Sequence, residues 1–497
     1  MTVTNHKHLQ MFIGGAWTNG RGTKTANNIN PANTTQVLGT VAQGTLDDVE
    51  DAVTAAKKAY PGWKATPAPK RGQVLFRARE LMLERQEMLA RALSMEEGKL
   101  LGESRGELQR ALNVLEFTAG EGRRLNGETA PSELPNTFIY TARAPLGVVG
   151  IVTPWNFPVA IPIWKLAPAL LCGNAVIFKP ASLTPWTANI ITEIFKDAGL
   201  PPGVLNLVYG SGSTVGQRIV THPDIVALSF TGSNEVGTRL YADAAPLLKK
   251  VQCEMGGKNP VIVLEDADIE LAALGTVQGA FGSTGQRCTA TSRAVVVESV
   301  ADRFVERVVH HTKTIKVGDP LTEGVGMGPA VDEGQFKTDL EYVEIGKKEG
   351  ATLLCGGERP TDAALKNGFF MTPAVFDHVK PHSRLGQEEV FGPVLSIVRV
   401  KDFEEAVEVA NSVRFGLTSS IYTNNIARSL QYADRVETGM LHVNSPTVGG
   451  EAHVPFGGAK ATGIGQREMG KTAIDFYSEW RTVYVDYTGQ KRQGNLY

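Results

Sequence analysis

Residues 148–178 read VVGIVTPWNFPVAIPIWKLAPALLCGNAVIF, and this stretch decides the fold class. The apolar runs 148–152 and 175–178 are short and uninterrupted, which is typical of strands that are buried on both faces. The segment 159–171 between them is long enough to form a buried helix. A strand, a helix and a second strand in this order predict a βαβ unit with two parallel strands.

The same alternation extends in both directions from this unit. Upstream, apolar residues recur at helical spacing over 46–60 and 70–98, where Glu97-Gly98 ends the second helix. Downstream, we expect a helix over 185–198 and strands at 204–208, 226–230, 261–264, 294–297 and 394–399. The sequence therefore predicts an α/β fold with two parallel-sheet layers, divided near residues 254–258.

The length and composition limit the classes of function. A chain of 497 residues is too long for one ordinary core, so two or three domains are expected. Lys and Arg total 50 against 52 Asp and Glu, which leaves no basic excess for binding nucleic acid. The 53 glycines are about 11% of the chain against a typical ~7%, which indicates many tight turns and close backbone approaches.

The cysteine count and the apolar segments indicate the compartment. Four scattered cysteines without a C-x-x-C pair predict neither a disulfide framework nor a structural zinc site, and no metal is expected. The N-terminal residues lack the apolar core of a signal peptide. The uncharged stretch 144–164 contains four prolines, which would break a spanning helix. We expect a cytoplasmic protein with no membrane partner.

Glycine is most concentrated where predicted strands meet predicted helices. The segments 210–216 and 231–237 follow the strands 204–208 and 226–230. Turns of this kind let backbone N–H groups face a phosphate. Neither segment matches the G-x-G-x-x-G dinucleotide fingerprint, so each taken alone is more often an ordinary βα turn than a nucleotide site.

Cys288 is the candidate nucleophile among the four cysteines. It follows the loop residues GSTGQR and precedes an expected helix start at Thr289. A loop position, the adjacent guanidinium of Arg287 and a helix N-terminus would each lower the pKa of the thiol. A core cysteine after a flexible turn is the alternative, and burial as a small hydrophobic residue is expected for Cys172, Cys253 and Cys355.

Four polar residues beside predicted strands or turns are ambiguous when each is taken alone. Glu254 ends a strand-like run and is either a base held in a pocket or a surface acid. Asn156 is a turn residue or an active-site amide, and Lys179 ends a buried strand. Glu389 lies in EEVFGP and would usually be a surface acid.

Seven motifs, in their order along nearly the whole chain, together resemble the aldehyde dehydrogenase superfamily. They are PWNFP (154–158), FKPAS (178–182), FTGSNEVG (230–237), EMGGK (254–258), GQRC (285–288), EEVFGPV (388–394) and PFGG (455–458). The resemblance implies a dinucleotide-binding domain (1–123 and 146–255), a catalytic domain (256–472) and a small β oligomerisation arm (124–145 and 473–497). It implies a homodimer or homotetramer, in which the alternating segment 480–487 is expected to find its partner strand on a neighbouring subunit.

The resemblance also assigns chemical roles. Cys288 matches the nucleophile, Asn156 an oxyanion donor and Glu254 the general base that activates water. The other matches line the cofactor site: Trp155 in the cleft, Lys179 and Glu389 at the ribose hydroxyls, Gly232 and Ser233 at the pyrophosphate, and Phe391 beside the nicotinamide. The presence of Cys288, Glu254 and Asn156 argues against a catalytically inactive relative, and Glu254 favours water over phosphate or CoA as the acyl acceptor.

Two positions depart from the superfamily pattern. Where strictly NAD-preferring members carry a glutamate, this chain has Ser182, which does not repel a 2′-phosphate. Electrostatics therefore favour NADP, with NAD possible, because Lys179 is close enough to pair with that phosphate. Ser283 replaces an asparagine of the thiol loop, which is not a catalytic group.

Longer stretches, among them 327–347 and 443–458, resemble the 2-oxoglutarate semialdehyde (2,5-dioxopentanoate) dehydrogenases. Succinic semialdehyde, or a broad range of aldehydes, is the alternative substrate. A dicarboxylic semialdehyde needs a cation for its distal carboxylate. The candidates by composition are Arg287 and either Arg123 or Arg124, although Arg287 is as readily explained as a neighbour of the thiol or as facing away. The aromatic residues that match the substrate entrance are Phe157, Trp164 and Phe456.

Overall fold

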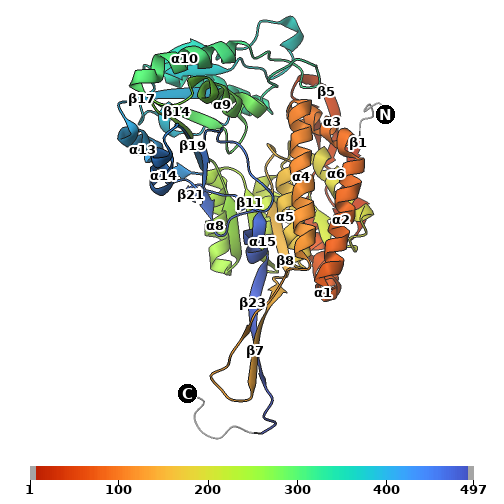
Figure 1. The fold of residues 1–497 in the computed structure, drawn as a ribbon. Helices are drawn as coiled ribbons and strands as arrows, with labels where there is room; N and C mark the ends of the chain where they lie inside the picture. The colour runs from red at the N-terminus through yellow and green to blue at the C-terminus, as the bar shows by residue number, and fades with distance from the viewer. Residues whose placement is uncertain (1–6, 491–497) are drawn as a thin grey trace.

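Two β-sheets organise the chain, and the computed structural model describes residues 7–490 (Figure 1). Each sheet lies in its own lobe with its own hydrophobic core, and a narrow β arm projects from the lobe that contains the first sheet. The fold is α/β with parallel strands in both sheets, which confirms the predicted fold class.

The first sheet contains the βαβ unit from which the fold was predicted. In spatial order, its strands are β22 (Gly463–Ile464), β12 (Lys250–Glu254), β11 (Ile225–Thr231), β8 (Val148–Val152), β9 (Ala175–Lys179), β10 (Leu205–Leu207), β2 (Met11–Ile13) and β3 (Ala16–Thr18). The five central strands are parallel, and β22, β2 and β3 are antiparallel additions at the edges. The chain runs β8, β9, β10 towards one edge and then crosses back to place β11 and β12 on the other side of β8.

Helices cover this sheet and surround its strands. They are α1 (Leu46–Ala65), α2 (Ala68–Glu84), α3 (Gln86–Glu97), α4 (Leu101–Glu121), α5 (Ala160–Leu171), α6 (Pro185–Asp197), α7 (Gln217–Thr221), α8 (Asn234–Ala244) and α15 (Gly470–Phe476). Helix α4 packs directly on α5. The single helix predicted over 70–98 is wrong, because the chain breaks at Arg85 between α2 and α3.

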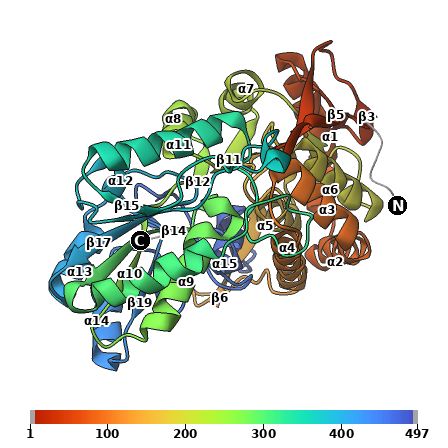
Figure 2. The same cartoon turned by 90° about the horizontal axis from the view of Figure 1, so that it is seen from above.

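The second sheet lies between helices on both faces (Figure 2). Its strands are β15 (Thr352–Cys355), β16 (Ala374–Asp377), β17 (Val394–Val400), β14 (Thr291–Val297), β13 (Asn259–Val263), β19 (Thr418–Tyr422) and β20 (Met440–Val443). Its helices are α9 (Ile269–Phe281), α10 (Glu298–Lys313), α11 (Glu333–Lys348), α12 (Arg384–Gln387), α13 (Phe403–Asn411) and α14 (Ile426–Arg435). Phe456 and Met469 pack in the first core, although both fall in the range 256–472 that was predicted for the catalytic domain.

The arm is a three-stranded antiparallel sheet of β6 (Thr129–Ala130), β7 (Thr137–Pro145) and β23 (Ser478–Asp486). Strand β23 pairs with β7 of the same chain from Ser478 opposite Pro145 to Asp486 opposite Thr137. The prediction that segment 480–487 finds its partner on a neighbouring subunit is therefore wrong for this edge. Residues 491–497, which were also predicted to belong to the arm, lie outside the described residues.

Smaller elements complete the described chain. Strands β1 (Lys7–Leu9), β5 (Asn33–Ala42) and β4 (Thr25–Asn30) form one small sheet, and β18 (Phe415–Gly416) pairs with β21 (Ala459–Lys460). Within residues 7–490, no helix is both long and apolar enough to cross a membrane. The same residues contain no cluster of three or more potential metal ligands.

Candidate active site

Residues from five of the seven motifs line a cavity of about 330 Å³ between the two sheets, whereas FKPAS (178–182) and PFGG (455–458) do not line it. Strand order reverses between β8 and β11, and ligands of open α/β sheets bind beyond the carboxyl ends of strands at such a point. The loops that follow β8 and β11 line the cavity from the first sheet. Among the predicted site residues, those lining it are Trp155, Asn156, Gly232, Ser233, Cys288, Glu389 and Phe391.

Asn156 lies in the loop between β8 and α5, and its side chain points towards the thiol loop. The Nδ2 atom of its buried amide donates to the backbone oxygen of Gln286 at 3.1 Å. Gln286 is two residues before Cys288, so this hydrogen bond joins the Asn156 loop to the thiol loop. The resemblance predicted that Asn156 and Cys288 act together, and the structure places them on the same cavity.

Cys288 precedes β14 on a turn that no helix follows. The expected helix start at Thr289 is wrong, because Thr289 continues the turn and the strand begins at Thr291. Burial raises the pKa of the Cys288 thiol, and the nearby Glu254 and Glu389 raise it further. The expected lowering of the pKa is therefore also wrong. A thiol must lose its proton before its sulfur can act as a nucleophile.

Arg287 faces away from the cavity and contacts helix α4. Its Nη2 donates to Glu103 Oε1 at 3.1 Å and its Nε donates to Ser283 Oγ at 3.0 Å. Arg287 was expected either to bind the substrate carboxylate or to serve no such role, as a neighbour of the thiol or by facing away. The geometry favours a guanidinium that faces away from the cavity. Arg124 also forms an ion pair, with Glu121 at 2.7 Å.

Glu254 ends strand β12 and is almost fully buried. One carboxylate oxygen, Oε2, lies beside the turn at Gly457, where an added Cβ atom would come within 2.8 Å of it. The other, Oε1, is buried without a hydrogen-bond partner. Burial, reinforced by the charge of Glu468, raises the pKa of Glu254 well above its ordinary value. A buried carboxyl with a raised pKa has the property that a general base requires near neutral pH.

The opposite end of the cavity has the features of a dinucleotide site. Ser233 caps α8, accepting a hydrogen bond from the Val236 N–H at 3.3 Å, and this places the positive end of the helix dipole beside Gly232. The rings of Trp155 and Phe391 meet edge to face at 5.5 Å across the cavity. The backbone of Phe391 is left-handed, with φ of 60°, which turns its ring towards the cavity.

The remaining cofactor candidates differ in their exposure. Glu389 Oε1 accepts the Gly257 N–H at 2.8 Å, and burial raises the pKa of this carboxyl to about 7. Lys179 ends strand β9, where burial lowers the pKa of its amine to about 8. Ser182 is exposed beyond it. A carboxylate that can accept from hydroxyls, a helix N-terminus and an ammonium group fit a nicotinamide dinucleotide.

The aromatic residues predicted at the substrate entrance lie deeper than an entrance would. Trp164 and Phe456 pack with ring centroids 5.3 Å apart, and both belong to the first hydrophobic core. Phe157 is half-buried, with Lys99 Nζ 3.8 Å above its ring. Neither Trp164 nor Phe456 is among the residues that line a described cavity.

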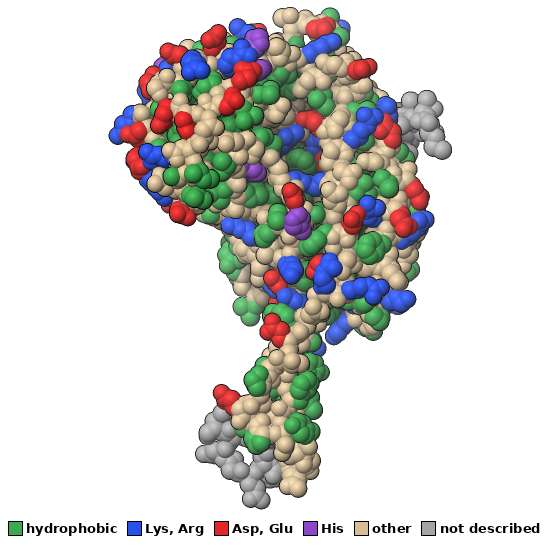
Figure 3. All heavy atoms as spheres, viewed as in Figure 1, with side chains coloured by type: hydrophobic (Ala, Val, Ile, Leu, Met, Phe, Trp, Pro, Cys, Tyr) green, Lys and Arg blue, Asp and Glu red, His purple; other side chains and the backbone are tan. Residues whose placement is uncertain are grey.

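Sequence reasoning missed a second cavity, of about 720 Å³, formed by one face of α4 and the segment 450–453. On this face Arg110 donates through Nη2 to the Gly450 oxygen at 2.6 Å. Burial lowers the pKa of Arg110, and the titratable groups Cys288 and Glu107 oppose this lowering. The helical spacing of Gly106, Arg110 and Asn113 was a readable signal for a shared face. Figure 3 shows blue side chains in the hollow between the lobes.

The profile of the aldehyde dehydrogenase family matches residues 17–483. The chain is 44% identical over 483 residues to the alpha-ketoglutaric semialdehyde dehydrogenase of Bacillus subtilis, covering 97% of this chain and 99% of that protein. It is 45% identical over 471 residues to the 2,5-dioxopentanoate dehydrogenase of Saccharolobus solfataricus, covering 94% and 97%. The solved betaine aldehyde dehydrogenase from Staphylococcus aureus, in complex with NAD+, superimposes with a TM-score of 0.95 at 33% identity, covering 97% and 95%.

The chain therefore belongs to the aldehyde dehydrogenase family, and the resemblance read from the seven motifs is confirmed. It is an oxidoreductase that acts on aldehydes.

Proposed function

We propose that the protein oxidises 2,5-dioxopentanoate (2-oxoglutarate semialdehyde) to 2-oxoglutarate, with a nicotinamide dinucleotide as hydride acceptor. The observation that carries the chemistry is the cavity on which Cys288 and Asn156 converge, with the capped helix α8 at its other end. The substrate is supported by the names of the two relatives from Bacillus and Saccharolobus. Succinic semialdehyde or a broad range of aldehydes remains the alternative.

In the proposed first step, Cys288 loses its proton and its sulfur attacks the aldehyde carbon, so that a C–S bond forms as the C=O double bond becomes an alkoxide. Negative charge develops on the former carbonyl oxygen of this thiohemiacetal. The Asn156 side-chain amide and the Cys288 N–H are the proposed donors to that oxygen. Donors placed in this way commonly contribute ~2.7–4 kcal/mol each.

In the second half of the reaction, the carbonyl re-forms as the carbon loses a hydride, which leaves a thioester on Cys288. When bound, the nicotinamide accepts that hydride with both electrons. Glu254 then takes a proton from water, and the resulting hydroxide attacks the thioester carbon and releases the carboxylate product. Cys288 leaves as a thiolate and takes up the proton that Glu254 removed from water, which restores the starting state of both groups. The proton lost from the thiol in the first step and the proton of the carboxylic acid product pass to solvent.

For the cofactor, the solved relative in complex with NAD+ supports a nicotinamide dinucleotide. We further propose that NADP is preferred over NAD. Ser182, which is proposed to lie near the adenosine ribose of the cofactor, is exposed and uncharged. Lys179, three residues earlier in the sequence, supplies a cation for a 2′-phosphate. Initial rates with saturating aldehyde and varied NADP or NAD test this preference, and a kcat/KM that favours NAD would overturn it.

We assign the substrate's distal carboxylate to Arg110. This guanidinium lines the second cavity, between α4 and the segment 450–453, and its charge acts on Cys288. A bound carboxylate would oppose the lowering of its pKa by burial. Arg287, by contrast, is paired with Glu103. The variant Arg110→Gln should raise the KM for 2,5-dioxopentanoate about tenfold or more, whereas the KM for propanal, which has no carboxylate, should change little.

The substrate assignment is tested by comparing purified enzyme on three aldehydes with both cofactors. We expect kcat/KM for 2,5-dioxopentanoate to exceed that for succinic semialdehyde and propanal. Equal or reversed values would make the broad-specificity alternative correct. Addition of CoA or phosphate should leave the product unchanged, because Glu254 directs water to the thioester.

Assembly, domain boundaries and compartment remain proposals. We propose a homodimer or homotetramer that buries the arm, along which Figure 3 shows hydrophobic side chains in green. The exposed apolar residues of the arm include Phe138, Trp480, Tyr484, Val485 and Tyr487. Strand β23 lies at the edge of its sheet, which leaves a strand edge for pairing. We propose the dinucleotide-binding, catalytic and arm segments with the residue ranges given above. We also propose a cytoplasmic location. Sedimentation of the purified chain would test the assembly, with a monomer as the contradicting result.

A further inference from the structure

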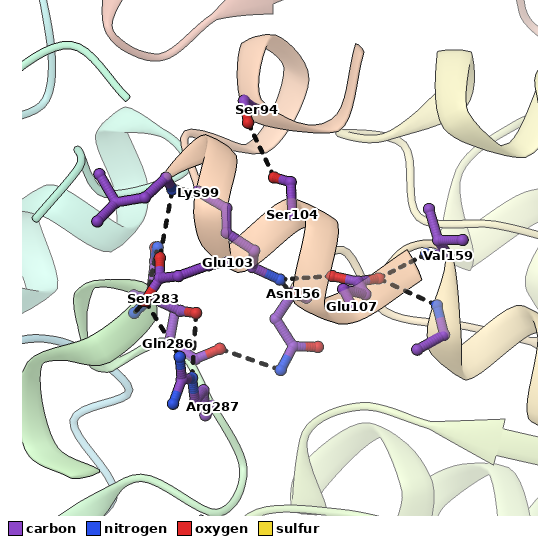
Figure 4. A network of polar contacts seen from close by, with 12 residues as sticks. Ser94, Lys99, Glu103, Ser104, Glu107, Asn156, Val159, Ser283, Gln286 and Arg287 are labelled. Atoms are coloured by element: carbon purple, nitrogen blue, oxygen red, sulfur yellow. Dashed lines mark hydrogen bonds and ion pairs between the residues drawn. The ribbon is translucent and has the colours of Figure 1, made fainter. Parts of the chain in front are cut away.

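Helix α4 contacts both loops that carry the proposed oxyanion donors (Figure 4). These loops come from different sheets, since Asn156 follows β8 and Cys288 precedes β14. Two acids one turn apart on α4, Glu103 and Glu107, each contact one of the loops. Besides the direct hydrogen bond from Asn156 to Gln286, a third element that belongs to neither loop therefore helps to set the distance between the two donors.

Glu107 and Lys99 fix the Asn156 loop. The Glu107 Oε1 atom accepts the Val159 N–H at 2.8 Å and the Ala160 N–H at 3.0 Å, at the start of α5. Its Oε2 accepts from Lys99 Nζ at 2.7 Å, and both side chains are fully buried. Lys99 Nζ also donates to the backbone carbonyl oxygen of Asn156 at 2.6 Å. The backbone is thus held on both sides of the Asn156 side chain.

Glu103 fixes the thiol loop in a costly conformation. Ser283, Thr284 and Gly285 have φ values of 51°, 59° and 71°, a left-handed run that non-glycine residues adopt only when their surroundings hold them. Glu103 Oε1 accepts the Ser283 N–H at 2.6 Å and also the Arg287 guanidinium at 3.1 Å. Because Arg287 Nε bonds Ser283 Oγ, Glu103 and Arg287 close the loop just before Cys288.

We propose that Glu103 and Arg287 are positioning residues, which hold the thiol loop against α4 so that the Cys288 N–H and the Asn156 amide converge on one oxygen. Arg287 then acts on the loop and does not bind the substrate carboxylate. This inference rests on the proposed role of Cys288 as nucleophile. A small displacement of a reacting group can cost on the order of 10²-fold in rate, so loss of these contacts should be visible in kcat.

The test uses full-length Glu103→Ala, Glu103→Gln and Arg287→Met, each assayed with 2,5-dioxopentanoate and with propanal, which has no carboxylate. We expect Glu103→Ala and Arg287→Met to lower kcat by about tenfold or more for both aldehydes, with little change in KM. Glu103→Gln keeps an oxygen for the Ser283 N–H and should recover part of the loss. The double variant should be no slower than the slower single variant, since both remove one contact.

The matched control is Arg105→Gln, on the same helix. Arg105 pairs with Glu87 at 2.9 Å on an exposed face away from both loops, and its loss should change kcat less than twofold. Cofactor affinity and thermal midpoints, measured on all variants, should stay near wild type. The Glu103→Gln variant serves as the primary measurement if Glu103→Ala lowers the thermal midpoint.

Two results would overturn the positioning role. One is an Arg287→Met enzyme with a raised KM for 2,5-dioxopentanoate and normal propanal kinetics, which would make Arg287 a substrate ligand. The other is a kcat within twofold of wild type in both Glu103 variants. Failure of the proposed function would look different, because the wild-type enzyme would be inactive or the Cys288→Ala enzyme would be active. The positioning role is tested instead by the kcat of the Glu103 variants relative to that of the wild type.

Discussion

The two sheets contribute to the active site from opposite ends of their strands. In the first sheet the site residues follow the strands: Asn156 comes after β8, Ser233 after β11, and Glu254 is the last residue of β12. In the second sheet they precede the strands, since Cys288 comes before β14 and Glu389 before β17. The carboxyl edge of one sheet therefore faces the amino edge of the other across the cavity.

This difference shows which site residues are positioned by the order of the strands and which are positioned by contacts with other elements. At a carboxyl edge, a strand end and a following helix N-terminus already define a ligand site. At the amino edge, side chains from elsewhere set the loop shape. Asn259 Nδ2 donates to the Cys288 oxygen at 2.7 Å, and Glu103 holds Ser283. We expect substitutions on the two edges to interrupt different steps of the reaction.

The largest effect is expected at the amino edge, for Cys288→Ala. No thioester can form, so kcat should fall on the order of 10⁴-fold or more. The dissociation constant of the cofactor should change little, because Ser233 and Glu389 remain. The control is Cys355→Ala in strand β15, outside the cavity, which should keep its turnover. Near-normal turnover by Cys288→Ala would show that the second sheet does not supply the nucleophile.

At the carboxyl edge, Glu254→Gln should interrupt the later step. Loss of a general base commonly costs about 10²–10⁴-fold, here in thioester hydrolysis. A burst of reduced cofactor should remain, because the thioester forms before water is needed. Rapid-mixing absorbance measurements resolve the burst from the steady state. If the burst disappears together with turnover, Glu254 acts before the thioester.

Asn156→Ala, also at the carboxyl edge, should slow the earlier step instead. Loss of one oxyanion donor costs about 10²–10³-fold in kcat, and the burst should slow by the same factor. Asn156→Ala and Glu254→Gln both lie at the carboxyl edge of the first sheet, so their different effects on the burst compare two steps within one sheet. Asn156→Asp, which keeps the size but replaces the donor with a carboxylate oxygen, should be at least as slow. A fast burst in either variant would contradict the oxyanion role.

The smallest effect concerns Glu389 at the amino edge and depends on pH. Burial raises the pKa of Glu389 to about 7, and only the ionised carboxylate is a pure acceptor for ribose hydroxyls. As pH falls from 8 to 6 the carboxylate takes up a proton, so the KM for the cofactor should rise by up to ~10-fold. In Glu389→Gln this dependence should be flat. An unchanged slope in that variant would assign the titration to another group.

The sequence predicted the carboxyl edge better than the amino edge. Strands β8, β9 and β11 and helices α5 and α6 were located to within a residue or two, because their apolar runs are continuous or helically spaced. The position of Asn156 in the loop after β8 followed from the predicted strand and helix. The environment of Cys288 was predicted wrongly, since the expected helix start and the expected lowering of the thiol pKa are both absent. Burial by residues distant in sequence decided that pKa.

Long-range contacts explain the other misses. The partner of β23 is β7, more than 300 residues earlier along the chain, and no local pattern distinguishes it from a strand of another subunit. Arg287 looks available next to Cys288 in sequence, but its partner Glu103 lies on α4. The helical spacing of Arg110 with Gly106 and Asn113 indicates only a shared helix face. It does not mark Arg110 as a ligand, because the cavity forms only where the segment 450–453 packs over that face.

The sequence by itself determined the α/β class, the family and the residue types that the reaction needs, because these depend on local periodicity and on motifs of a few adjacent residues. Only the tertiary structure decided which arginine faces the cavity, which strand completes the arm and which acids hold the two donor loops. Each of those contacts joins residues far apart in the chain. Their geometry is set by packing between elements, which local sequence does not encode.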